Sequence, residues 1–337
     1  MMEKVRLGKT NLYVSRIGMG GIPIQRDNDD NAYNVVRTAY INGINFFDTA
    51  KGYTVSETYL GEAFKKLKAE FNGFRESIVI ASKSMSLTYD AMMNDVLDSI
   101  KKMDCDYIDL YQFHNLQPGK DYSGAKAALI EAKQKGLVKH IGVTSHNMDY
   151  LNELISDPLF ETIQYPYNIV ERQGEELFRK ANKLDIGVIG MKPLAGGAID
   201  DGAIAIKYIV NKDFVVVPIP GMGSVEEVIN NVGAVQSKLN ESDLTKIKEY
   251  QATLDGDFCR RCGYCKPCTK GIDIPFAFLC EGYYRRYNLQ EWAIQRYNTM
   301  KVKASECIEC GLCESRCPYN LPIIKKLKEA VKVLESK

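Results

Sequence analysis

The cysteines of this chain are distributed very unevenly. Nine of the ten lie between Cys259 and Cys317, and Cys105 is the only one among the first 258 of 337 residues. Residues 1–6 contain no apolar signal core, so we expect a cytoplasmic protein whose thiols stay reduced and available to metals. The net charge changes at the same place, from −4 in residues 1–254 to +5 in residues 255–337. The sequence therefore predicts two domains with these bounds.

The first domain alternates short apolar runs with helical patterns, after a predicted hairpin in the first 15 residues. The runs are continuously apolar, which is typical of parallel strands buried on both faces. Eight such units predict an α/β fold, a closed (β/α)8 TIM barrel, because no Gly-x-Gly-x-x-Gly follows the first strand to indicate an open dinucleotide-binding sheet. The predicted strands are 17–20, 44–48, 78–83, 108–114, 140–144, 162–165, 187–191 and 215–219.

Composition excludes several classes of protein. Apolar residues make up 45% of the chain and charged residues 26%, as in ordinary globular proteins. No apolar run reaches the length of about 18 residues that a membrane span needs. The net charge of +1 argues against a dedicated nucleic-acid binder. We expect neither a membrane nor a nucleic acid as partner.

Polar side chains follow three consecutive predicted strands. Asp48 ends the second strand and Tyr53 follows it, while Lys83 and His114 end the third and fourth. The carboxyl ends of barrel strands share one face, so the four side chains can meet there. An ammonium group beside a phenol lowers the phenol's pKa, a carboxylate would hold that ammonium group, and an imidazole could orient a carbonyl oxygen. Taken singly, Asp48 and Lys83 are more often a structural ion pair, His114 an interior histidine and Tyr53 one of 20 tyrosines, so it is the set of four at consecutive strand ends that favours function.

These residues resemble a known family, the aldo-keto reductases, over roughly residues 3–235. The segment Phe47-Asp48-Thr49-Ala50-x-x-Tyr53, followed by Ser56-Glu57, is similar to the family's second-strand signature. The resemblance implies Tyr53 as proton donor, Lys83 and Asp48 as the groups that tune it, and His114 as the group that orients substrate. It also implies a nicotinamide cofactor, NAD(P)(H).

The cofactor segments resemble the family less completely. On the carboxamide side, Ser145 and Gln164 match, His146 replaces an asparagine and Met191 replaces a stacking aromatic residue. The full set implied by resemblance is Ser145, His146, Gln164, Met191, Pro193, Leu194, Gly221, Met222, Gly223, Ser224, Glu227 and Asn231. Where many NADPH-using members have Arg or Lys, this chain has Met222, Ser224 and Glu227. A 2′-phosphate prefers a guanidinium or ammonium group, so we favour NADH.

The second domain carries two dense runs of four cysteines. The second run has the spacing Cys-x2-Cys-x2-Cys-x3-Cys-Pro of bacterial ferredoxins. The metal ligands predicted from the two runs are Cys259, Cys262, Cys265, Cys268, Cys307, Cys310, Cys313 and Cys317. Zinc ribbons instead separate two cysteine pairs by a longer spacer. We therefore predict a small, mainly helical, ferredoxin-like domain with two [4Fe–4S] clusters, and one cluster or zinc as alternatives.

Analogy with two-cluster ferredoxins implies how the cysteines are shared. Cys317 would join the first three cysteines of the first run, and Cys268 would join the first three of the second. The first run lacks the longer final gap, and Thr269 replaces the proline, so this pairing stays open. Cys280 and Cys105 are left over and are expected to be inert, Cys280 as a buried apolar residue.

The function expected from these features is NAD(P)H-dependent reduction of an aldehyde or ketone to an alcohol, or the reverse. The clusters would transfer electrons or support the structure, the host would be an anaerobe, and a ferredoxin- or flavodoxin-like protein could dock on Arg260, Arg261 and Lys266. The alternative is a non-catalytic nucleotide-sensing or scaffold subunit of a larger redox complex. Substrate identity and oligomeric state are not encoded in any motif that we find.

Overall fold

The computed structural model describes residues 2–26 and 28–335, which form two compact units. Unit one comprises Met1–Asn168, Arg172–Pro193 and Asp201–Leu239. Unit two comprises Ile169–Glu171, Leu194–Asp200 and Asn240–Lys337. Helix α10 (Glu241–Leu254) thus belongs to unit two, although the sequence analysis placed it in the first domain. Two short segments that directly follow barrel strands in the chain also belong to unit two.

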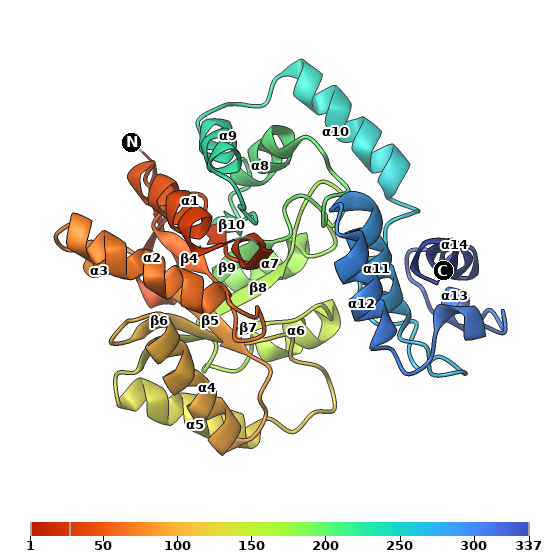
Figure 1. Ribbon diagram of the computed structural model, residues 1–337, viewed down its shortest axis with the longest axis horizontal. Coiled ribbons are helices and arrows are strands. Elements are labelled where there is room, and N and C mark those ends of the chain that lie inside the picture. The colour runs from red at the N-terminus through yellow and green to blue at the C-terminus, as the bar shows by residue number, and fades with distance from the viewer. Residues whose placement is uncertain (1, 27, 336–337) are drawn as a thin grey trace. The chain divides into compact units, whose positions relative to one another are not determined.

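Unit one is the predicted barrel (Figure 1). Within the described residues, eight parallel strands lie in the order β10-β9-β8-β7-β6-β5-β4-β3. The sheet closes between its two edge strands, because Gly18 N–H donates to Pro218 O at 2.9 Å and Gly20 N–H donates to Pro220 O at 2.8 Å. The strands are β3 (Met19–Gly20), β4 (Phe46–Asp48), β5 (Val79–Ser84), β6 (Ile108–Phe113), β7 (Val138–Thr144), β8 (Thr162–Pro166), β9 (Gly187–Met191) and β10 (Val217–Ile219). The predicted fold class is confirmed.

Helices surround the strands, and their ends follow local sequence signals. Asn28 caps the first helix, because its side chain accepts a hydrogen bond from Asn31 N–H. Asn147 and Asp201 cap two later helices in the same way. The helices of unit one are α1 (Asp29–Ile41), α2 (Ser56–Glu70), α3 (Phe74–Ser77), α4 (Tyr89–Lys102), α5 (Ser123–Gln134), α6 (Met148–Leu154), α7 (Glu175–Lys183), α8 (Gly202–Val210) and α9 (Val225–Val235).

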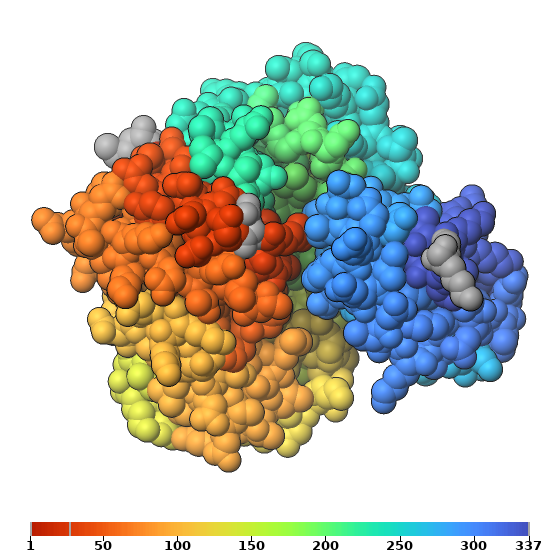
Figure 2. All heavy atoms as spheres, viewed as in Figure 1, coloured from red at the N-terminus to blue at the C-terminus, as the bar shows by residue number. Residues whose placement is uncertain are grey.

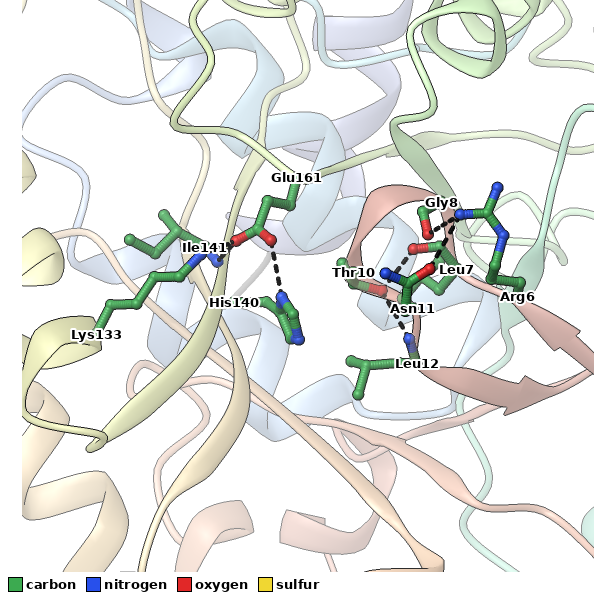
Figure 3. A network of polar contacts seen from close by, with 10 residues as sticks. All are labelled: Arg6, Leu7, Gly8, Thr10, Asn11, Leu12, Lys133, His140, Ile141 and Glu161. Atoms are coloured by element: carbon green, nitrogen blue, oxygen red, sulfur yellow. Dashed lines mark hydrogen bonds and ion pairs between the residues drawn. The ribbon is translucent and has the colours of Figure 1, made fainter.

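The predicted N-terminal hairpin closes the amino-terminal end of the barrel. Strands β1 (Lys4–Arg6) and β2 (Tyr13–Ser15) are joined by a short helical turn in which Thr10 Oγ1 donates to Leu7 O at 2.5 Å (Figure 3). Leu7 is fully buried in the core that fills the barrel. Gly8 is required here, because a Cβ atom would lie 2.3 Å from Gly187 N. The hairpin thus seals one end of the barrel and leaves the opposite end for chemistry.

A second polar network lies between strands β7 and β8. His140 Nδ1 is 2.8 Å from Glu161 Oε2, and Ile141 N–H donates to Glu161 Oε1 at 3.1 Å (Figure 3). Partial burial opposes ionisation of Glu161, but hydrogen bonds from His140 and Lys133 prevail and lower its pKa to about 2. This histidine is therefore a structural residue at the amino-terminal side of the barrel.

Unit two is mainly helical, as predicted. Its elements after α10 are α11 (Ile274–Arg286), α12 (Gln290–Asn298), a short turn (Ala304–Glu306), α13 (Leu312–Ser315) and α14 (Ile323–Leu334). Ile274, Phe278, Tyr297 and Leu327 contribute to a single buried core, into which several cysteines also pack. The space-filling view shows residues of these helices, in blue, as one closely packed body (Figure 2). Along the described stretches of chain, no helix is long and apolar enough to cross a membrane.

Candidate functional site

The four polar residues predicted at the strand ends converge in the structure. Asp48 is the last residue of β4, Lys83 lies in β5 and His114 directly follows β6. Backbone bonds fix these ends, because His114 N–H donates to Ser84 O at 2.8 Å. Tyr53 lies in the loop before α2, where its N–H donates to Ala50 O at 2.9 Å. The barrel register therefore places three of the four residues on adjacent strands.

The buried ion pair is the best-defined part of this site. Lys83 Nζ lies 2.6 Å from Asp48 Oδ1 and donates to Thr49 O at 2.7 Å. Both side chains are buried, with exposed fractions of 1% for Lys83 and 3% for Asp48. The Lys83 ammonium group lies 5.2 Å from the centre of the Tyr53 ring. The rings of Tyr53 and His114 meet edge to face, with 5.6 Å between their centres. The four side chains thus form one cluster.

The sequence analysis expected Lys83 to lower the pKa of Tyr53, and that expectation is wrong for this structure. Burial raises the phenol's pKa well above its usual value, and the charge of Asp48 raises it further. The physical reason is that Asp48, which pairs with Lys83, brings its own negative charge close to the phenol and so opposes a phenolate. Tyr53 therefore keeps its proton at neutral pH.

His114 is neutral under the same conditions. Burial lowers its pKa to about 3, and the positive charges of Lys83 and Lys192 lower it further. Its Nδ1 atom is buried and has no hydrogen-bond partner among the described residues. The same holds for Asp48 Oδ2. A neutral imidazole carries one N–H donor and one acceptor, so it can hold a polar substrate without adding charge.

The residues predicted on the carboxamide side lie at the carboxyl ends of the next three strands. Ser145 follows β7 and is fully buried, and its Oγ donates to Leu116 O at 3.0 Å. Gln164 lies in β8 and accepts a hydrogen bond from Gln112 Nε2 at 3.0 Å. His146 Nε2 is 3.2 Å from Lys192 Nζ. Met191 ends β9, and Pro193 follows it as a buried residue. The donors and acceptors of an amide-binding site are therefore present.

On the adenosine side, the structure brings the predicted loop and helix together. Ser224 caps α9, because its side chain accepts a hydrogen bond from Glu227 N–H. The Glu227 carboxylate in turn accepts a hydrogen bond from Gly223 N–H at 2.6 Å. Met222 and Asn231 are buried and Gly221 is exposed. The Glu227 carboxylate therefore already accepts the hydrogen bond that the Gly223 N–H, just before α9, can donate. Leu194, the remaining predicted residue, belongs to unit two.

Three residues at this end of the barrel were missed as site residues from the sequence. Gln112 is fully buried in β6, and Glu57 accepts a hydrogen bond from Ser82 Oγ at 2.7 Å. Lys192 has a left-handed backbone conformation, with φ of 58°, which is uncommon for a residue with a side chain. A signal for Gln112 was available, because an uncharged polar residue interrupts an apolar strand two positions before His114.

The eight predicted metal-binding cysteines of unit two divide between two cavities. The first, here called cavity I, is lined by Cys259, Cys262, Cys265 and Cys317. The second, cavity II, is lined by Cys268, Cys307, Cys310 and Cys313. These are the two sets that the ferredoxin analogy implies. Among the described residues, no three His, Cys, Asp or Glu side chains converge closely enough to hold a single metal ion. Thiols around a cavity suit a cluster with several metal atoms better than one zinc ion.

The thiols of cavity I resist ionisation in the protein alone. Burial raises the pKa of Cys265 to about 12, and neighbouring thiols, beginning with Cys259, raise it further. Metal ligation needs thiolates, so the positive charge of iron would have to offset this cost. Cys105 and Cys280 lie elsewhere and are buried, and burial raises the pKa of each to about 11. Burial therefore favours the protonated, unreactive form of both thiols.

The predicted docking residues of unit two are not a surface patch. Arg260 is only 5% exposed, and it donates to Asp255 Oδ1 at 2.7 Å and to Val170 O at 3.3 Å. The Arg261 side chain is 11% exposed. Lys266 is exposed but pairs with Asp273 at 3.0 Å. The expectation of a docking site on these three residues is therefore wrong, because both guanidinium groups are enclosed within unit two and Lys266 already pairs with Asp273.

Comparisons with known proteins agree with this geometry. Residues 16–203 match the Aldo/keto reductase family, and residues 258–322 match a 4Fe-4S dicluster domain. The NADH-specific methylglyoxal reductase of Escherichia coli is 28% identical over 241 residues, which is 62% of this chain and 72% of that protein. The L-galactose dehydrogenase of Arabidopsis thaliana is 27% identical over 220 residues, 59% of this chain and 68% of that protein.

A solved structure shows the same fold. An aldo-keto reductase from Bacillus halodurans in its holo form superimposes with a TM-score of 0.66 at 24% identity, covering 74% of this chain and 96% of that chain. The family match spans more than half of the chain and includes Asp48, Tyr53, Lys83 and His114. This chain therefore belongs to the aldo/keto reductase family and carries a 4Fe-4S dicluster domain in the C-terminal part of its sequence.

Proposed function

We propose that this protein is an NADH-dependent carbonyl reductase, acting on a small aldehyde or ketone, that also holds two [4Fe–4S] clusters. The observation that carries the proposal is the convergence of Tyr53, His114 and the Lys83–Asp48 pair, with Lys83 Nζ 2.6 Å from Asp48 Oδ1. A bound reduced nicotinamide would supply the hydride. Ser145, His146, Gln164, Met191 and Pro193 would hold its carboxamide side.

The protein's own residues would manage the proton and the substrate. Tyr53 keeps its hydroxyl proton at neutral pH and can donate it as the carbonyl oxygen gains negative charge. Neutral His114 can donate a hydrogen bond to the same oxygen and fix its position. The Lys83 ammonium group lies 5.2 Å from the centre of the Tyr53 ring, and its pairing with Asp48 adds no net charge there. Buried surroundings exclude water, which strengthens each of these interactions.

The test compares wild-type protein with Tyr53→Phe, which removes only the phenolic hydroxyl. NADH oxidation is measured anaerobically with a panel of carbonyl compounds that includes methylglyoxal. We expect kcat to fall by about 10² to 10⁴, the usual contribution of a general acid. Tyr13→Phe, at the exposed position of strand β2, is the matched control and should not change the rate. Equal rates for wild type and Tyr53→Phe, or no turnover of any carbonyl, would favour the non-catalytic nucleotide-sensing or scaffold subunit.

The preference for NADH rests on Glu227. Its carboxylate accepts the Gly223 N–H at 2.6 Å and would repel a 2′-phosphate nearby. The similarity to an NADH-specific methylglyoxal reductase supports the same choice. We expect Glu227→Lys to raise the ratio of kcat/KM for NADPH to that for NADH by about tenfold. Glu226→Lys, in the same turn of α9, is the control with the same change in charge, and an equal rise there would contradict the assignment.

We further propose that cavities I and II each hold one [4Fe–4S] cluster, bound by the four cysteines that line it. A bound cluster would supply a one-electron centre, and a ferredoxin- or flavodoxin-like protein is the class of partner that could exchange electrons with it. Iron and sulfide analysis should give about eight iron atoms per chain. Potentiometry tests the redox role: clusters that never change oxidation state over an accessible range of potentials would be structural.

A further inference from the structure

One buried amide beside the catalytic cluster has no role in the proposed mechanism. Gln112 lies in β6 and is fully buried. In the register of the sheet it lies beside Lys83, because these two residues are partners in the pairing of β6 with β5. An amide in the interior of a barrel costs free energy unless its donors and acceptors are used. The contacts of the Gln112 amide therefore indicate what this side chain does.

The Gln112 amide reaches across one strand to a second glutamine. Its Nε2 atom donates to Gln164 Oε1 at 3.0 Å, and Gln164 lies in β8, with β7 between the two strands. Gln164 is only 1% exposed, so water does not compete for this bond. Gln112 Oε1 is buried and has no hydrogen-bond partner among the described residues, a cost that an apolar side chain would avoid. The bond from Nε2 to Gln164 therefore explains a glutamine at this position.

A glycine on the strand between the two amides makes room for this contact. Gly142 of β7 is the register partner of Gln112 on one side and of Thr162 on the other. A Cβ atom on Gly142 would lie 3.1 Å from Gln112 Cγ and 2.1 Å from Thr162 Oγ1. Glycine weakens the interior of a strand and often marks a place where other groups approach the backbone closely. The Gln112 side chain thus lies over Gly142 on its way to Gln164.

The bond between the two amides determines which polar atom Gln164 turns toward a ligand. A glutamine amide has an oxygen that accepts hydrogen bonds and a nitrogen that donates two. Because Gln164 Oε1 faces Gln112, the Nε2 atom of Gln164 faces away from it. Gln164 therefore offers N–H groups, rather than its oxygen, to a group that binds beside it.

Ser145 is restricted in the opposite sense. Its hydroxyl group donates its proton to Leu116 O at 3.0 Å, and its Oγ accepts a hydrogen bond from Asn147 N–H at 3.0 Å. With its single proton in use, Ser145 Oγ can only accept a further hydrogen bond. A carboxamide has one carbonyl oxygen and one NH2 group, so a site with donors from Gln164 and an acceptor from Ser145 suits one orientation of that group.

We propose that Gln112 is a positioning residue for the cofactor: by holding Gln164 Oε1, it directs the Gln164 N–H groups to the carboxamide oxygen of the nicotinamide. Ser145 then accepts a hydrogen bond from the carboxamide NH2 group. This inference rests on the proposed function, which assigns Gln164 and Ser145 to the carboxamide. Gln112 acts through Gln164 and does not contact the cofactor. Strand β6, which leads into His114, thereby also fixes the amide that holds the nicotinamide.

The first experiment measures NADH binding by calorimetry, with full-length protein purified anaerobically so that its clusters stay intact. Gln112→Met keeps the length of the side chain and removes its donor, so the Gln164 amide is no longer held. We expect the dissociation constant for NADH to rise about tenfold, as for the loss of one buried hydrogen bond. Gln134→Met, at an exposed position of α5, is the matched control and should change it less than about twofold. An unchanged dissociation constant in Gln112→Met would overturn the proposal.

Two cofactor analogues test which atom of the carboxamide Gln164 holds. Reduced acetylpyridine adenine dinucleotide keeps the carbonyl oxygen and replaces the NH2 group by a methyl group, so Gln112→Met should still weaken its binding about tenfold. Reduced thionicotinamide adenine dinucleotide replaces the oxygen by sulfur, a weak acceptor, so Gln112→Met should weaken its binding less than about threefold. The reverse pattern would mean that Gln164 turns its oxygen to the cofactor, and the proposal would be wrong.

A double-mutant cycle separates positioning from a general loss of structure. If Gln112 acts only through Gln164, adding Gln112→Met to Gln164→Met should raise the dissociation constant for NADH by less than about twofold. A side chain that merely supports the barrel would cause the same loss in either background, and that additive result would refute the positioning role. Binding of the sulfur analogue, which Gln112→Met should largely retain, shows that this variant is folded.

These measurements do not depend on turnover, because cofactor binding needs no carbonyl substrate. Wild-type protein that binds NADH but reduces no carbonyl compound would refute the carbonyl reductase proposal and leave the role of Gln112 intact. Carbonyl reduction by wild type, together with equal NADH binding by wild type and Gln112→Met, would refute the role of Gln112 alone. Wild-type protein that binds no NADH would overturn both.

Discussion

The two units of this protein differ in how closely their buried positive charges are paired with negative ones. In the barrel, the Lys83 ammonium group is 1% exposed and is matched at once by Asp48 at 2.6 Å and by Thr49 O at 2.7 Å. In unit two, the Arg261 side chain is 11% exposed, and its nearest carboxylate is 3.8 Å away. The barrel site is electrostatically complete as folded, whereas in unit two the ion pair of Arg261 is longer, and Arg261 Nε and Nη2 have no hydrogen-bond partner among the described residues.

The largest effect should come from breaking the completed pair in the barrel. Lys83→Met leaves Asp48 buried without its partner, which should lower the free energy of unfolding by about 3–5 kcal/mol. Lys102→Met removes an exposed cation 3.0 Å from Asp98 and is the control, with an expected loss below about 0.5 kcal/mol. Urea unfolding measures both values. Equal losses would mean that the buried pair is no better organised than a surface pair.

The next effect concerns pH and the same barrel site. Burial lowers the pKa of His114 to about 3, against 6.5 in an unfolded chain. The neutral ring thus stabilises the fold fully above pH 6.5, and this contribution is lost as the pH falls toward 3. The slope should approach about 1.4 kcal/mol per pH unit. His114→Gln should remove this slope. An identical pH dependence of the urea midpoint in wild type and His114→Gln would show that the histidine is not held neutral.

A smaller effect is expected from Arg261 of unit two, whose ion pair with Glu171 is long. Arg261→Gln removes a positive charge from the wall of cavity I, so the reduced cluster loses an attractive neighbour. At a fixed potential, the ratio of reduced to oxidised cluster should fall about tenfold. Potentiometry with electron paramagnetic resonance measures the ratio. Lys266→Gln, which removes an exposed cation paired with Asp273, is the control. An equal change in the ratio for this variant would contradict the role assigned to Arg261.

The smallest effect belongs to the structural network at the other end of the barrel. Hydrogen bonds lower the pKa of Glu161 to about 2, against 4.5 for the free side chain. Its contribution is therefore present above pH 4.5 and is lost as the pH falls toward 2. Glu161→Gln should lower stability at pH 7 by no more than about 1 kcal/mol, and the difference from wild type should vanish near pH 2. Urea midpoints at the two pH values check this.

Much of the barrel could be predicted from the sequence, and for physical reasons. A strand buried on both faces must be continuously apolar, so β5, β6 and β9 were visible as apolar runs. The polar residues that interrupt or follow such runs, Lys83 and His114, were visible for the same reason. Gln112 was not identified as a site residue, because a single polar residue within a strand has many explanations until the register of β6 with β5 is known.

The electrostatics of the site could not be predicted in the same way. The sequence analysis expected Lys83 to lower the pKa of Tyr53, whereas burial and Asp48 raise it. Arg260 and Arg261 looked like exposed docking residues and are instead enclosed within unit two. A pKa and a degree of exposure depend on every neighbouring atom, and most of those neighbours are distant in sequence.

By itself, the sequence determined the eight strand–helix units, the four polar residues at the strand ends and the two runs of cysteines. Each of these features depends only on the spacing of nearby residues and on the periodicity of apolar residues. Only the tertiary structure decided which cysteines share a cavity, which cations are neutralised and how deeply Arg260 and Arg261 are enclosed. Those outcomes depend on contacts between segments such as Gly196 and Arg286, which are 90 positions apart. Local sequence patterns determine which helices and strands form, and tertiary packing determines which charged groups each helix or strand contacts.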